Sequence, residues 1–542
     1  MKRSGGAIIV QCLLEQGVDT VFGYPGVSII RVYDELYKVR RQIRHVLTAH
    51  EQGAAHAADG YARATGRVGV CLATSGPGAT NLITGIAAAF MDSSPVVFLT
   101  CNVAERLLGR DAFQEVDITG ISMPITKCSY LVRSADQLAD TLREAFALAA
   151  GGRPGPVLVD VTYNATEELA DYDFLPREKH LTESRAARML RRGESFLRRP
   201  EIDRADVETL ADMLRAAKRP LLLAGGGVIR AGGGEALRQL ALGRSLPVAA
   251  TMMGLGALPA DAPVFLGMAG MYGTAAANEA IDQCDLLAAF GVRFSDRVTG
   301  PAERFARNAR LVHVDIDRAE IDKNVETAHH IVGDAREVLR LLDGALGSYR
   351  APDWLPPRPA PAPWSGPAAL VAAIDRLTGG EALVVTDVGQ HQLWAAKGYG
   401  FRHPGQLITS GGYGAMGFGL GAALGAKAGC PEKTVVHITG DGSFRMNCPE
   451  LATEVRYGLP VITVVFNNGA LGLVRQKQTR DFRRRYSQTD LNGGPDLTKL
   501  AEAYGLPAFR TETQADFEAA FSRLLALGGG VLDCAIGKDE TV

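Results

Sequence analysis

Residues 435–443 read Val-Val-His-Ile-Thr-Gly-Asp-Gly-Ser, and residues 461–468 read Val-Ile-Thr-Val-Val-Phe-Asn-Asn. Each stretch is a short apolar run that predicts a buried strand, and each ends in glycine or polar residues. A helical pattern over residues 449–457 lies between them, so the order predicts one βαβ unit with parallel strands. The two polar ends then lie at the carboxyl ends of neighbouring strands, where open α/β sheets bind their ligands.

Two side chains at those strand ends have the chemistry of a magnesium site. Asp441 supplies a carboxylate and Asn468 an amide oxygen, and Mg²⁺ is usually held by few protein oxygens together with phosphate oxygens. Gly440 and Gly442 let the backbone approach such a phosphate closely. An ordinary glycine-rich turn beside a polar strand end is the alternative interpretation of the same residues.

The composition is that of an ordinary globular protein. Of the 542 residues, 46% are apolar and 22% are charged, and the formal net charge is −2, which gives no footprint for nucleic acid or for a basic membrane patch. The eight cysteines show no C-x-x-C spacing, as expected of reduced thiols in the cytoplasm. No signal peptide or transmembrane stretch is recognisable. We therefore expect a cytoplasmic protein whose partners include neither nucleic acid nor a membrane.

Short strands alternate with helical patterns along three segments of the chain, and the length also favours about three domains. The predicted fold class is α/β, with three domains that are each a mainly parallel sheet flanked by helices. We place the domains at residues 1–170, 190–347 and 368–542. An arginine-rich segment, residues 184–204, is expected to be a linker with a helix, and the Pro-rich residues 351–367 a semi-extended spacer.

The first domain contains a run of small residues, 50–63, that predicts a helix opening on Glu51. By itself, a carboxylate at this place is a helix N-terminal acid stabilised by the helix dipole. That structural interpretation competes with a catalytic one for the same residue.

The central domain carries a candidate nucleotide site. Residues 221–227 predict a strand that runs into a glycine-rich turn, and residues 311–317 predict a strand that ends in carboxylates. Nucleotide-binding α/β domains use this pairing for phosphates and ribose. Arg230 stands where the G-x-G-x-x-G pattern needs its last glycine, so the pattern alone leaves nucleotide binding open.

An ordered set of motifs over almost the whole chain resembles one family. The Gly-Asp-Gly and Asn-Asn clusters are similar to the diphosphate-anchoring motif of thiamine-diphosphate enzymes, and the Glu51 helix resembles their glutamate-bearing helix. Further stretches resemble acetohydroxyacid synthase (acetolactate synthase) large subunits: residues 23–26, 74–81, 111–115, 387–392 and 411–419. Others resemble the flavin-contacting segments of the FAD-containing members: residues 253–256, 270–274 and 290–297. The resemblance implies a pyrimidine-binding first domain, an FAD-binding-like central domain and a diphosphate-binding third domain.

The resemblance also implies the site residues. Contacts to thiamine diphosphate are expected from Tyr24, Pro25, Gly26, Glu51, Thr74, Pro77, Asn81, Val388, Gly389, Gln390, His391, Gly414, Met416, Gly440, Asp441, Gly442, Ser443, Asn468 and Leu471. Mg²⁺ is expected on Asp441, Asn468 and the backbone carbonyl of Ala470. FAD is expected on Arg153, Gly225, Gly226, Gly227, Met253, Gly254, Gly270, Met271, Gly273, Gly291, Arg293, Asp315 and Asp317.

Catalysis in the resembled family assigns further roles. Glu51 is expected to hydrogen-bond the aminopyrimidine ring and so to promote the loss of the thiazolium C2 proton. Phe113, Gln114, Lys127 and Arg297 match positions that line the substrate channel. An arginine there can hold an acceptor carboxylate, whereas a lone arginine is more often part of a surface salt bridge.

The implied activity is that of an acetolactate synthase in branched-chain amino-acid biosynthesis. Pyruvate is decarboxylated, and its two-carbon unit is ligated to a second 2-oxoacid: pyruvate gives 2-acetolactate, and 2-oxobutyrate gives 2-aceto-2-hydroxybutyrate. The flavin has no net redox role in this reaction. The resemblance further implies a homodimer or homotetramer with active sites at the dimer interface, and a small regulatory subunit as an additional partner.

Several departures from the family pattern keep alternatives open. Lys477 stands where the family has a tryptophan that shapes the acceptor pocket, Gly421 where a proline is usual, and Cys128 where a histidine often stands. Residues 161–164 also differ, and relatives continue past Val542 with a tail over the active site. One alternative is a related enzyme that uses a different acceptor. Another is a catalytically idle cofactor-binding regulatory protein. Glyoxylate carboligase is disfavoured because such relatives have an apolar residue where Glu51 stands.

Overall fold

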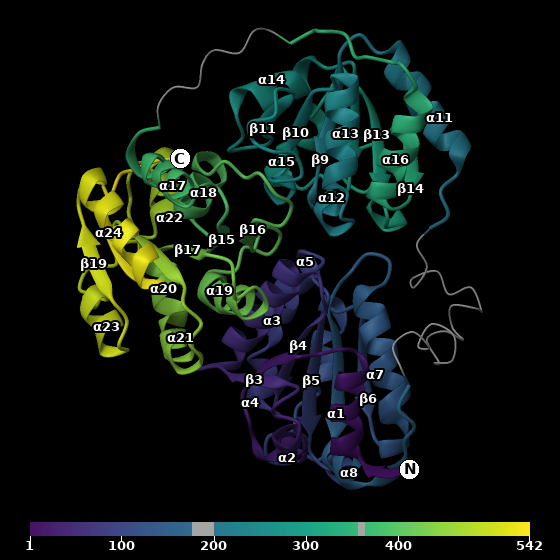
Figure 1. Cartoon of the computed structure of the whole chain (residues 1–542), viewed down its shortest axis with the longest axis vertical. Helices are drawn as coiled ribbons and strands as arrows, with labels where there is room; N and C mark the ends of the chain where they lie inside the picture. Colours follow the sequence, from purple (N-terminus) through teal and green to yellow (C-terminus); the bar gives the residue numbers. More distant parts are fainter. Residues whose placement is uncertain (176–199, 356–363) are drawn as a thin grey trace.

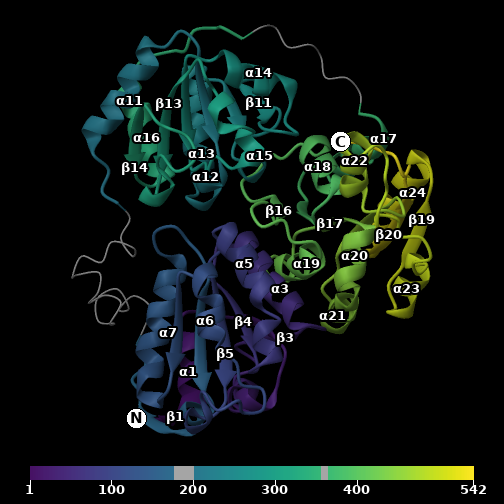
Figure 2. The ribbon, with the colours of Figure 1, turned by 180° about the vertical axis from the view of Figure 1, so that it is seen from behind.

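The computed structural model describes residues 1–175, 200–355 and 364–542. These form three domains, each built on a six-stranded sheet in which every pair of neighbouring strands runs parallel, as the sequence predicts. Figures 1 and 2 show the three sheets with their helices around a common meeting point. Most of the arginine-rich segment and the middle of the Pro-rich segment, for which a linker and a spacer are expected, lie outside the described residues.

The first domain has the strand order β3-β2-β4-β5-β7-β6. Its strands are β2 (Thr20–Gly23), β3 (Arg44–Leu47), β4 (Gly69–Ala73), β5 (Val96–Asn102), β6 (Cys128–Val132) and β7 (Val157–Thr162). Its helices are α1 (Gly5–Glu15), α2 (Ile30–Lys38), α3 (Glu51–Thr65), α4 (Pro77–Thr80), α5 (Ile83–Met91), α6 (Ile118–Ser122), α7 (Ala135–Ala150) and α8 (Tyr163–Glu167). A separate antiparallel pair joins β1 (Lys2–Ser4) to β8 (Leu169–Asp171).

The central domain has the strand order β11-β10-β9-β12-β13-β14. Its strands are β9 (Pro220–Ala224), β10 (Val248–Ala250), β11 (Phe265–Met268), β12 (Leu286–Phe290), β13 (Arg310–Asp315) and β14 (His329–Val332). Its helices are α11 (Arg204–Ala216), α12 (Gly226–Arg230), α13 (Gly234–Arg244), α14 (Ala275–Gln283), α15 (Asp296–Thr299) and α16 (Ala335–Leu346).

The third domain has the strand order β16-β15-β17-β18-β20-β19. Its strands are β15 (Leu383–Thr386), β16 (Leu407–Thr409), β17 (Val435–Gly440), β18 (Ile462–Asn467), β19 (Ala508–Thr511) and β20 (Gly530–Ala535). Its helices are α17 (Gly366–Leu377), α18 (Gln390–Gly398), α19 (Phe418–Gly429), α20 (Asp441–Asn447), α21 (Leu451–Tyr457), α22 (Gly472–Asp481), α23 (Leu497–Ala503) and α24 (Gln514–Leu527).

The sheets are parallel because helices cover both of their faces. In β4, the side chains of Val70 and Leu72 pack with α1, α2 and α7, whereas those of Cys71 and Ala73 pack with α3 and α5. A strand buried on both faces reads as a continuous apolar run, which is the pattern that predicts it. Among the described residues, no helix combines the length and the apolarity needed to cross a bilayer.

Two details of the third domain differ from the prediction. Helix α20 begins directly at Asp441, and a 3-10 turn at Cys448–Glu450 separates it from α21, so the crossover between β17 and β18 holds two helices rather than the one expected over 449–457. The Gly-Asp-Gly-Ser start of α20 has the composition of a turn, so the sequence does not indicate a helix there. The buried side chain of Phe444 anchors the helical segment. The last two residues assigned to the spacer, Gly366 and Pro367, form the first turn of α17.

Helices α3 and α19 join the first domain to the third through an unusually close contact. A Cβ atom on Gly60 would lie 2.0 Å from the carbonyl oxygen of Ala422, and one on Gly425 would lie 1.8 Å from that of Ala57. Only glycine permits this approach, because the atoms opposite each Cα are backbone and cannot turn away. The contact therefore fixes the position of Glu51, the first residue of α3, relative to Phe418, the first residue of α19.

We expect Gly425→Ala to destabilise the protein by about 1–3 kcal/mol, because the added methyl must push α19 away from the backbone of α3. Gly243→Ala is the matched control, since Gly243 lies in helix α13 with no atom within 4 Å of an added Cβ. The control should be neutral or stabilising by about 0.5–1 kcal/mol, because alanine is the better helix former. Urea unfolding followed by circular dichroism measures both changes, and equal effects in the two variants would contradict the contact.

Candidate active site

The diphosphate side of the predicted site lies at the carboxyl edge of the third sheet. Residues 388–391 follow β15 and residues 440–443 follow β17, which neighbours β15 in the sheet. The Ser443 hydroxyl donates to the carbonyl oxygen of Val388 at 3.3 Å. A Cβ atom on Gly440 would lie only 2.9 Å from Nδ1 of His391. The structure therefore brings the two predicted diphosphate loops together, with glycine where a side chain would collide.

Two buried polar atoms in these loops have no hydrogen bond within the described part of the chain, although one of them, Oδ2 of Asp441, lies 3.8 Å from the guanidinium of Arg445. They are Oδ2 of Asp441 and Nε2 of His391. Burial raises the pKa of Asp441 to about 6, against the opposing effect of Arg445, and burial lowers the pKa of His391 to about 4, so its imidazole is neutral at pH 7. A buried carboxylate oxygen without a hydrogen bond suits a cation, and a neutral imidazole nitrogen suits a phosphate oxygen. These residues therefore fit magnesium and diphosphate.

The other predicted magnesium and thiazolium contacts lie beside Asp441. Asn468, after the adjacent strand β18, accepts from the backbone N–H of Ala470 at 3.1 Å and donates to Gln390 at 3.4 Å. Side-chain atoms of Leu471 and Met416 lie 2.8 and 3.7 Å from where a Cβ on Gly442 would be. No group of three or more His, Cys, Asp or Glu side chains in the described residues forms a metal cluster. An ion here would rely on one carboxylate, one amide and one carbonyl.

Asp387 is a buried anchor of this site that the sequence did not single out as a site residue. Its carboxylate accepts from the Gly419 N–H at 2.9 Å and from the Thr439 hydroxyl at 2.8 Å, and it contacts Nε2 of His437 at 3.0 Å. Burial opposes its ionisation, but His437 and Gly419 overcome that effect and lower its pKa to about 2. Asp387 thereby ties the loop 388–391 to the start of α19. The only sequence signal is a carboxylate at the end of an apolar strand.

The pyrimidine side of the predicted site lies at the carboxyl edge of the first sheet. The amide Nδ2 of Asn81 donates to Oε2 of Glu51 at 3.0 Å. Cβ atoms on Gly26 and Gly78 would lie 2.4 and 2.7 Å from side-chain atoms of Thr74. The structure therefore gathers the three predicted motifs, residues 24–26, 74–81 and Glu51, at one place. Glu51 opens α3, as predicted.

The four predicted substrate-channel residues lie in different surroundings, three of them in the first domain and one in the central domain. Gln114 has a positive φ of 59° and its carbonyl oxygen lies 2.7 Å from where a Cβ on Gly76 would be, so it borders the pyrimidine motif. Phe113 is 88% exposed. Lys127 donates to the carbonyl oxygens of Leu148 and Gly151 at 2.5 and 2.7 Å, and burial lowers its pKa to about 8. The Lys127 ammonium therefore satisfies two carbonyl oxygens at the C-terminal end of helix α7.

Arg297 lies apart from those three residues, on the central domain. Its side chain is exposed, 3.9 Å from the carboxylate of Asp296 and 3.9 Å from the sulfur of Met271. The Met271 N–H donates to the Arg297 carbonyl oxygen at 2.9 Å, so α15 and the turn 270–273 are one unit.

Apart from Arg153, which precedes β7 of the first domain and donates to Asp317, the predicted flavin contacts follow five adjacent strands of the central sheet, β11, β10, β9, β12 and β13. Gly227 donates to the Gly291 carbonyl oxygen at 3.1 Å, and a Cβ on Gly225 would lie 2.1 Å from that oxygen. Asp315 ends β13 and accepts from the Asp317 N–H at 2.9 Å. Glycine-rich turns packed backbone to backbone beside a carboxylate strand end form the edge that dinucleotides bind. Arg230 in place of the last glycine does not disturb this edge, because α12 ends there.

The two halves of the thiamine site are not joined within the chain. Among the residues that the structure describes, no hydrogen bond or ion pair connects Glu51, Thr74 or Asn81 with the loops 388–391 and 440–443. Glu450 instead links the domains at the start of α3, accepting from the N–H groups of Ala49 and His50 at 3.1 Å. Within the described residues, the two halves are therefore separate polar clusters.

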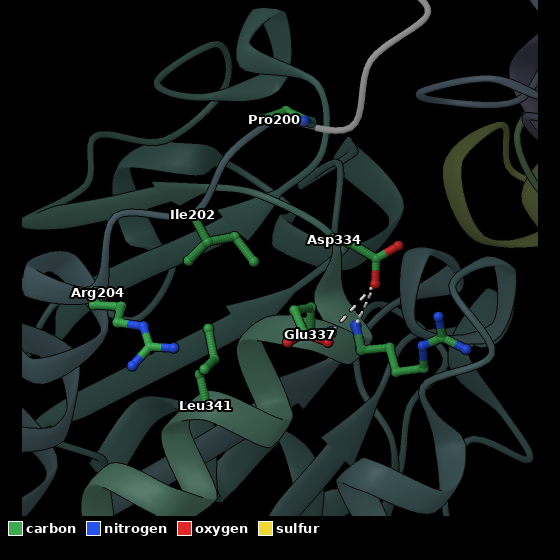
Figure 3. A pocket seen from close by; sticks show the side chains of 7 residues that line it. Pro200, Ile202, Arg204, Asp334, Glu337 and Leu341 are labelled. Atoms are coloured by element: carbon green, nitrogen blue, oxygen red, sulfur yellow. Dashed lines mark hydrogen bonds between the residues drawn. The ribbon is translucent and has the colours of Figure 1, made fainter. Parts of the chain in front are cut away.

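A cavity of about 310 Å³ at the edge of the central domain is unrelated to these motifs (Figure 3). It is lined by Pro200, Ile202, Arg204, Asp334, Arg336, Glu337 and Leu341, none of which is a predicted site residue. Asp334 caps helix α16 by accepting from the N–H groups of Arg336 and Glu337. The cavity is therefore not part of the candidate active site.

Comparison with known proteins agrees with this arrangement of domains. Three models of the thiamine pyrophosphate enzyme family match the chain: the N-terminal TPP binding domain at residues 3–121, the central domain at 207–342 and the C-terminal TPP binding domain at 387–533. The acetolactate synthase isozyme 2 large subunit of Escherichia coli (strain K12) is 44% identical over 541 residues, covering 98% of this chain and 94% of that protein. The chain belongs to the thiamine pyrophosphate enzyme family, among the acetolactate synthase large subunits.

Relatives from other sources agree with that placement. The acetolactate synthase large subunit of Haemophilus influenzae is 41% identical over 561 residues, covering 100% of this chain and 95% of that protein. A probable acetolactate synthase large subunit of Methanocaldococcus jannaschii is 43% identical over 528 residues, covering 93% of this chain and 87% of that protein. The predicted family is confirmed, and the chain is a thiamine-diphosphate-dependent enzyme of the acetolactate synthase type.

The contact between Asn81 and Glu51 leads to a prediction about acid–base chemistry. Glu51→Gln keeps an oxygen that accepts from Asn81 but removes the negative charge, so thiamine diphosphate should still bind while deprotonation at C2 slows by about 10²–10⁴-fold. Hydrogen–deuterium exchange at C2 of the bound cofactor, followed by NMR, measures the rate. Glu167→Gln, a surface change in the same domain, should leave that rate unchanged. An unchanged rate in Glu51→Gln would disprove the assignment.

The Asp441 oxygen that has no hydrogen bond leads to a second prediction. Asp441→Ala should abolish the Mg²⁺ dependence of thiamine diphosphate binding, because the carboxylate that holds the cation is lost. Calorimetric titrations with and without Mg²⁺ test this, with Asp441→Asn as a second variant that preserves shape. Equal affinity for the cofactor in the wild-type protein with and without Mg²⁺ would show that Asp441 has another role.

Proposed function

We propose that this chain is the catalytic subunit of an acetolactate synthase. Two pyruvate molecules, or pyruvate and 2-oxobutyrate, lose one CO₂, take up one proton and form one carbon–carbon bond, giving 2-acetolactate or 2-aceto-2-hydroxybutyrate. The observation that supports the proposal most is the buried Asp441 oxygen without a hydrogen bond, beside His391 and the glycines of both diphosphate loops. A catalytically idle protein has no need to keep such a costly buried group.

We propose the following roles for the site residues. Asp441, Asn468 and the Ala470 carbonyl hold Mg²⁺, and the loops 388–391 and 440–443 hold the diphosphate. Glu51, oriented by Asn81, hydrogen-bonds the aminopyrimidine ring and so promotes the loss of the thiazolium C2 proton. Thiamine diphosphate, when bound, supplies the electron sink that lets the carboxylate of pyruvate leave as CO₂. Phe113, Gln114, Lys127 and Arg297 border the substrates.

We further propose that the active site is completed across a homodimer, alone or within a homotetramer. Both halves of the site border exposed apolar side chains, including Tyr24, Val27 and Phe113 near the pyrimidine motif and Met446 on α20. Large apolar side chains exposed around a half-site mark an interaction surface. A second copy supplies the missing half for each, and a small regulatory subunit is an additional proposed partner.

We also propose FAD as a second cofactor, on the glycine-rich edge of the central sheet. The residues present fit it, because Gly225, Gly227 and Gly291 pack without side chains beside Asp315. The FAD supplies no redox step to the ligation, so it should stay oxidised during turnover. A cytoplasmic location is proposed from the eight cysteines, none of which forms a disulfide.

Product identification tests the proposed function. The purified protein is incubated with thiamine diphosphate, Mg²⁺ and FAD, and with pyruvate alone or with added 2-oxobutyrate. We expect CO₂ release together with acetolactate, and acetohydroxybutyrate when both substrates are present. CO₂ release without either product would favour the related enzyme with a different acceptor. An absence of CO₂ release from a protein that binds thiamine diphosphate would support the idle alternative.

One observation favours the alternative acceptor. Lys477 is 62% exposed and pairs with Asp481 at 2.8 Å on helix α22, so no large apolar surface stands at this place. Its neighbour Gln476 accepts from Gln390 of the diphosphate loop at 3.0 Å, which puts α22 beside the active site. The acceptor therefore meets a polar helix where the family pattern has a tryptophan.

We expect Lys477→Trp to raise the preference for 2-oxobutyrate over pyruvate as the acceptor, because the extra methyl then packs on an aromatic surface. One methylene in an apolar pocket is worth about 10–200-fold in discrimination. Competition between the two acceptors gives the ratio of acetohydroxybutyrate to acetolactate. Lys499→Trp, on the exposed surface of α23, is the matched control. A strong 2-oxobutyrate preference in the unmodified protein would refute this explanation.

A further inference from the structure

A single turn at the end of α5 receives contacts from all three domains, at the meeting point of α5, α12 and β16 (Figures 1 and 2). The turn consists of residues 92–94. The Asp92 side chain has no exposed surface. Its Oδ1 accepts from the Gly412 N–H at 2.7 Å, and its Oδ2 accepts from the Gly411 N–H at 3.1 Å. A residue of the first domain thus holds the backbone of a third-domain segment.

The buried Arg63 of α3 strengthens this hold. It donates to Oδ2 of Asp92 at 2.9 Å and to the carbonyl oxygen of Thr409, the last residue of β16, at 2.6 Å. It also donates to Asp59 at 2.7 Å and to the Ser94 hydroxyl at 3.0 Å. A buried charge is stable only when an opposite charge or hydrogen bonds compensate it. The ion pairs and hydrogen bonds of Arg63 and Asp92 therefore hold these side chains in one arrangement. The segment 409–412 is fixed by it and leads directly to the predicted thiamine contacts Gly414 and Met416.

The central domain reaches the same turn directly through Arg230, and indirectly through Asp317, which binds Arg153 of the first domain. Arg230, at the end of α12, donates to the backbone carbonyl oxygen of Asp92 at 3.1 Å. Arg153 donates to the Ser93 hydroxyl at 2.9 Å and to the carboxylate of Asp317 at 3.1 Å. Helix α12 starts within the glycine-rich turn of the predicted flavin edge. Arg230 therefore links that edge to the turn directly, and Arg153 links Asp317 of the same edge to Ser93 of the turn.

Predicted flavin contacts also touch the held segment itself. A Cβ atom on Gly411 would lie 2.2 Å from the sulfur of Met253, and one on Gly412 would lie 2.7 Å from a guanidinium nitrogen of Arg293. An added Cβ at either place would have to displace the side chain that lies against it. A movement of the Met253 or Arg293 side chain on ligand binding is therefore transmitted to the backbone of residues 411–412. The segment is thus packed from the flavin edge on one side and bonded to Asp92 on the other.

We propose that Asp92 is a positioning residue that holds residues 409–412 and couples the flavin edge of the central domain to the thiamine loop at Met416. The inference rests on the proposed function, because it takes thiamine diphosphate and FAD as the two ligands. Its consequence is energetic coupling, and coupling between two binding sites is reciprocal. FAD should tighten the binding of thiamine diphosphate, and thiamine diphosphate should tighten the binding of FAD by the same factor.

Arg230→Gln isolates the coupling, because Arg230 hydrogen-bonds the backbone of Asp92 rather than a predicted cofactor residue. The dissociation constant of thiamine diphosphate is measured by calorimetry in Mg²⁺, with and without saturating FAD. For the wild-type protein we expect a tightening in the range of about 5–150-fold. In Arg230→Gln both cofactors should still bind, but FAD should no longer tighten the binding of thiamine diphosphate. The ratio of the dissociation constants measured without and with FAD should then be about one. Arg238→Gln, whose arginine pairs with Glu235 on the surface of α13, should keep the wild-type factor.

A second measurement follows the segment directly. Hydrogen–deuterium exchange of peptides spanning residues 407–418 should slow on addition of FAD in the wild-type protein and in Arg238→Gln, but not in Arg230→Gln. Asp92→Asn, which leaves one acceptor oxygen for two N–H groups, should speed exchange of these peptides with or without FAD. If Asp92→Asn does not fold, Arg230→Gln alone decides.

The outcomes separate this inference from the proposed function. If both cofactors bind the wild-type protein and FAD leaves the thiamine diphosphate affinity unchanged, the inference is overturned and the proposed function stands. The same holds if Arg230→Gln keeps the full factor. A wild-type protein that binds thiamine diphosphate but no FAD would overturn this inference alone, whereas one that binds no thiamine diphosphate would overturn both.

Discussion

The close contact between α3 and α19 is the constraint on which the rest of the active-site geometry depends. Gly60 and Gly425 bring the two helix backbones together at distances that no side chain tolerates. Each helix begins at the site: α3 at Glu51, and α19 at Phe418, two residues after Met416. Because the interface consists of small residues against backbone, it has little freedom to slide. The positions of both functional segments follow from one packing contact between two domains.

Polar contacts at the ends of these helices complete what the packing begins. Asp387 accepts from the Gly419 N–H in the first turn of α19, and Glu450 accepts from the N–H groups of Ala49 and His50 just before α3. Burial raises the pKa of Glu450 and Thr453 opposes this by hydrogen bonding. These buried carboxylates satisfy helix-terminal N–H groups that have no partner within the helix. They fix the direction in which each helix leaves the site, which packing alone does not determine.

The strands and the glycine-rich edges were predictable from the sequence, because their signals are local. Apolar runs predicted β9, β13, β17 and β18, and the residues just after each run mark the carboxyl edge of its sheet. The long-range anchors were not predictable in this way. Asp387 bonds to residues 32 and 50 positions away, and Asp92 bonds to Gly412, 320 positions away. Nothing in a single sequence without a fold indicates which partner such a carboxylate will find. Helix α20 was missed for a local reason, because its Gly-Asp-Gly-Ser start has the composition of a turn.

Helix α22, which we propose to border the acceptor, is held much more weakly than the proposed cofactor loops. Helix α22 has no buried residue; it is bonded through Gln476 to Gln390 and through Arg475 to the exposed Asp539. An exposed helix face accepts a lysine in place of a tryptophan with little change in stability, because neither side chain has a core to fill. The buried carboxylates and glycines of the cofactor loops tolerate no such change. Cofactor chemistry and acceptor choice therefore reside in parts of the fold under different physical constraints, and the substitution at Lys477 is compatible with an intact cofactor site.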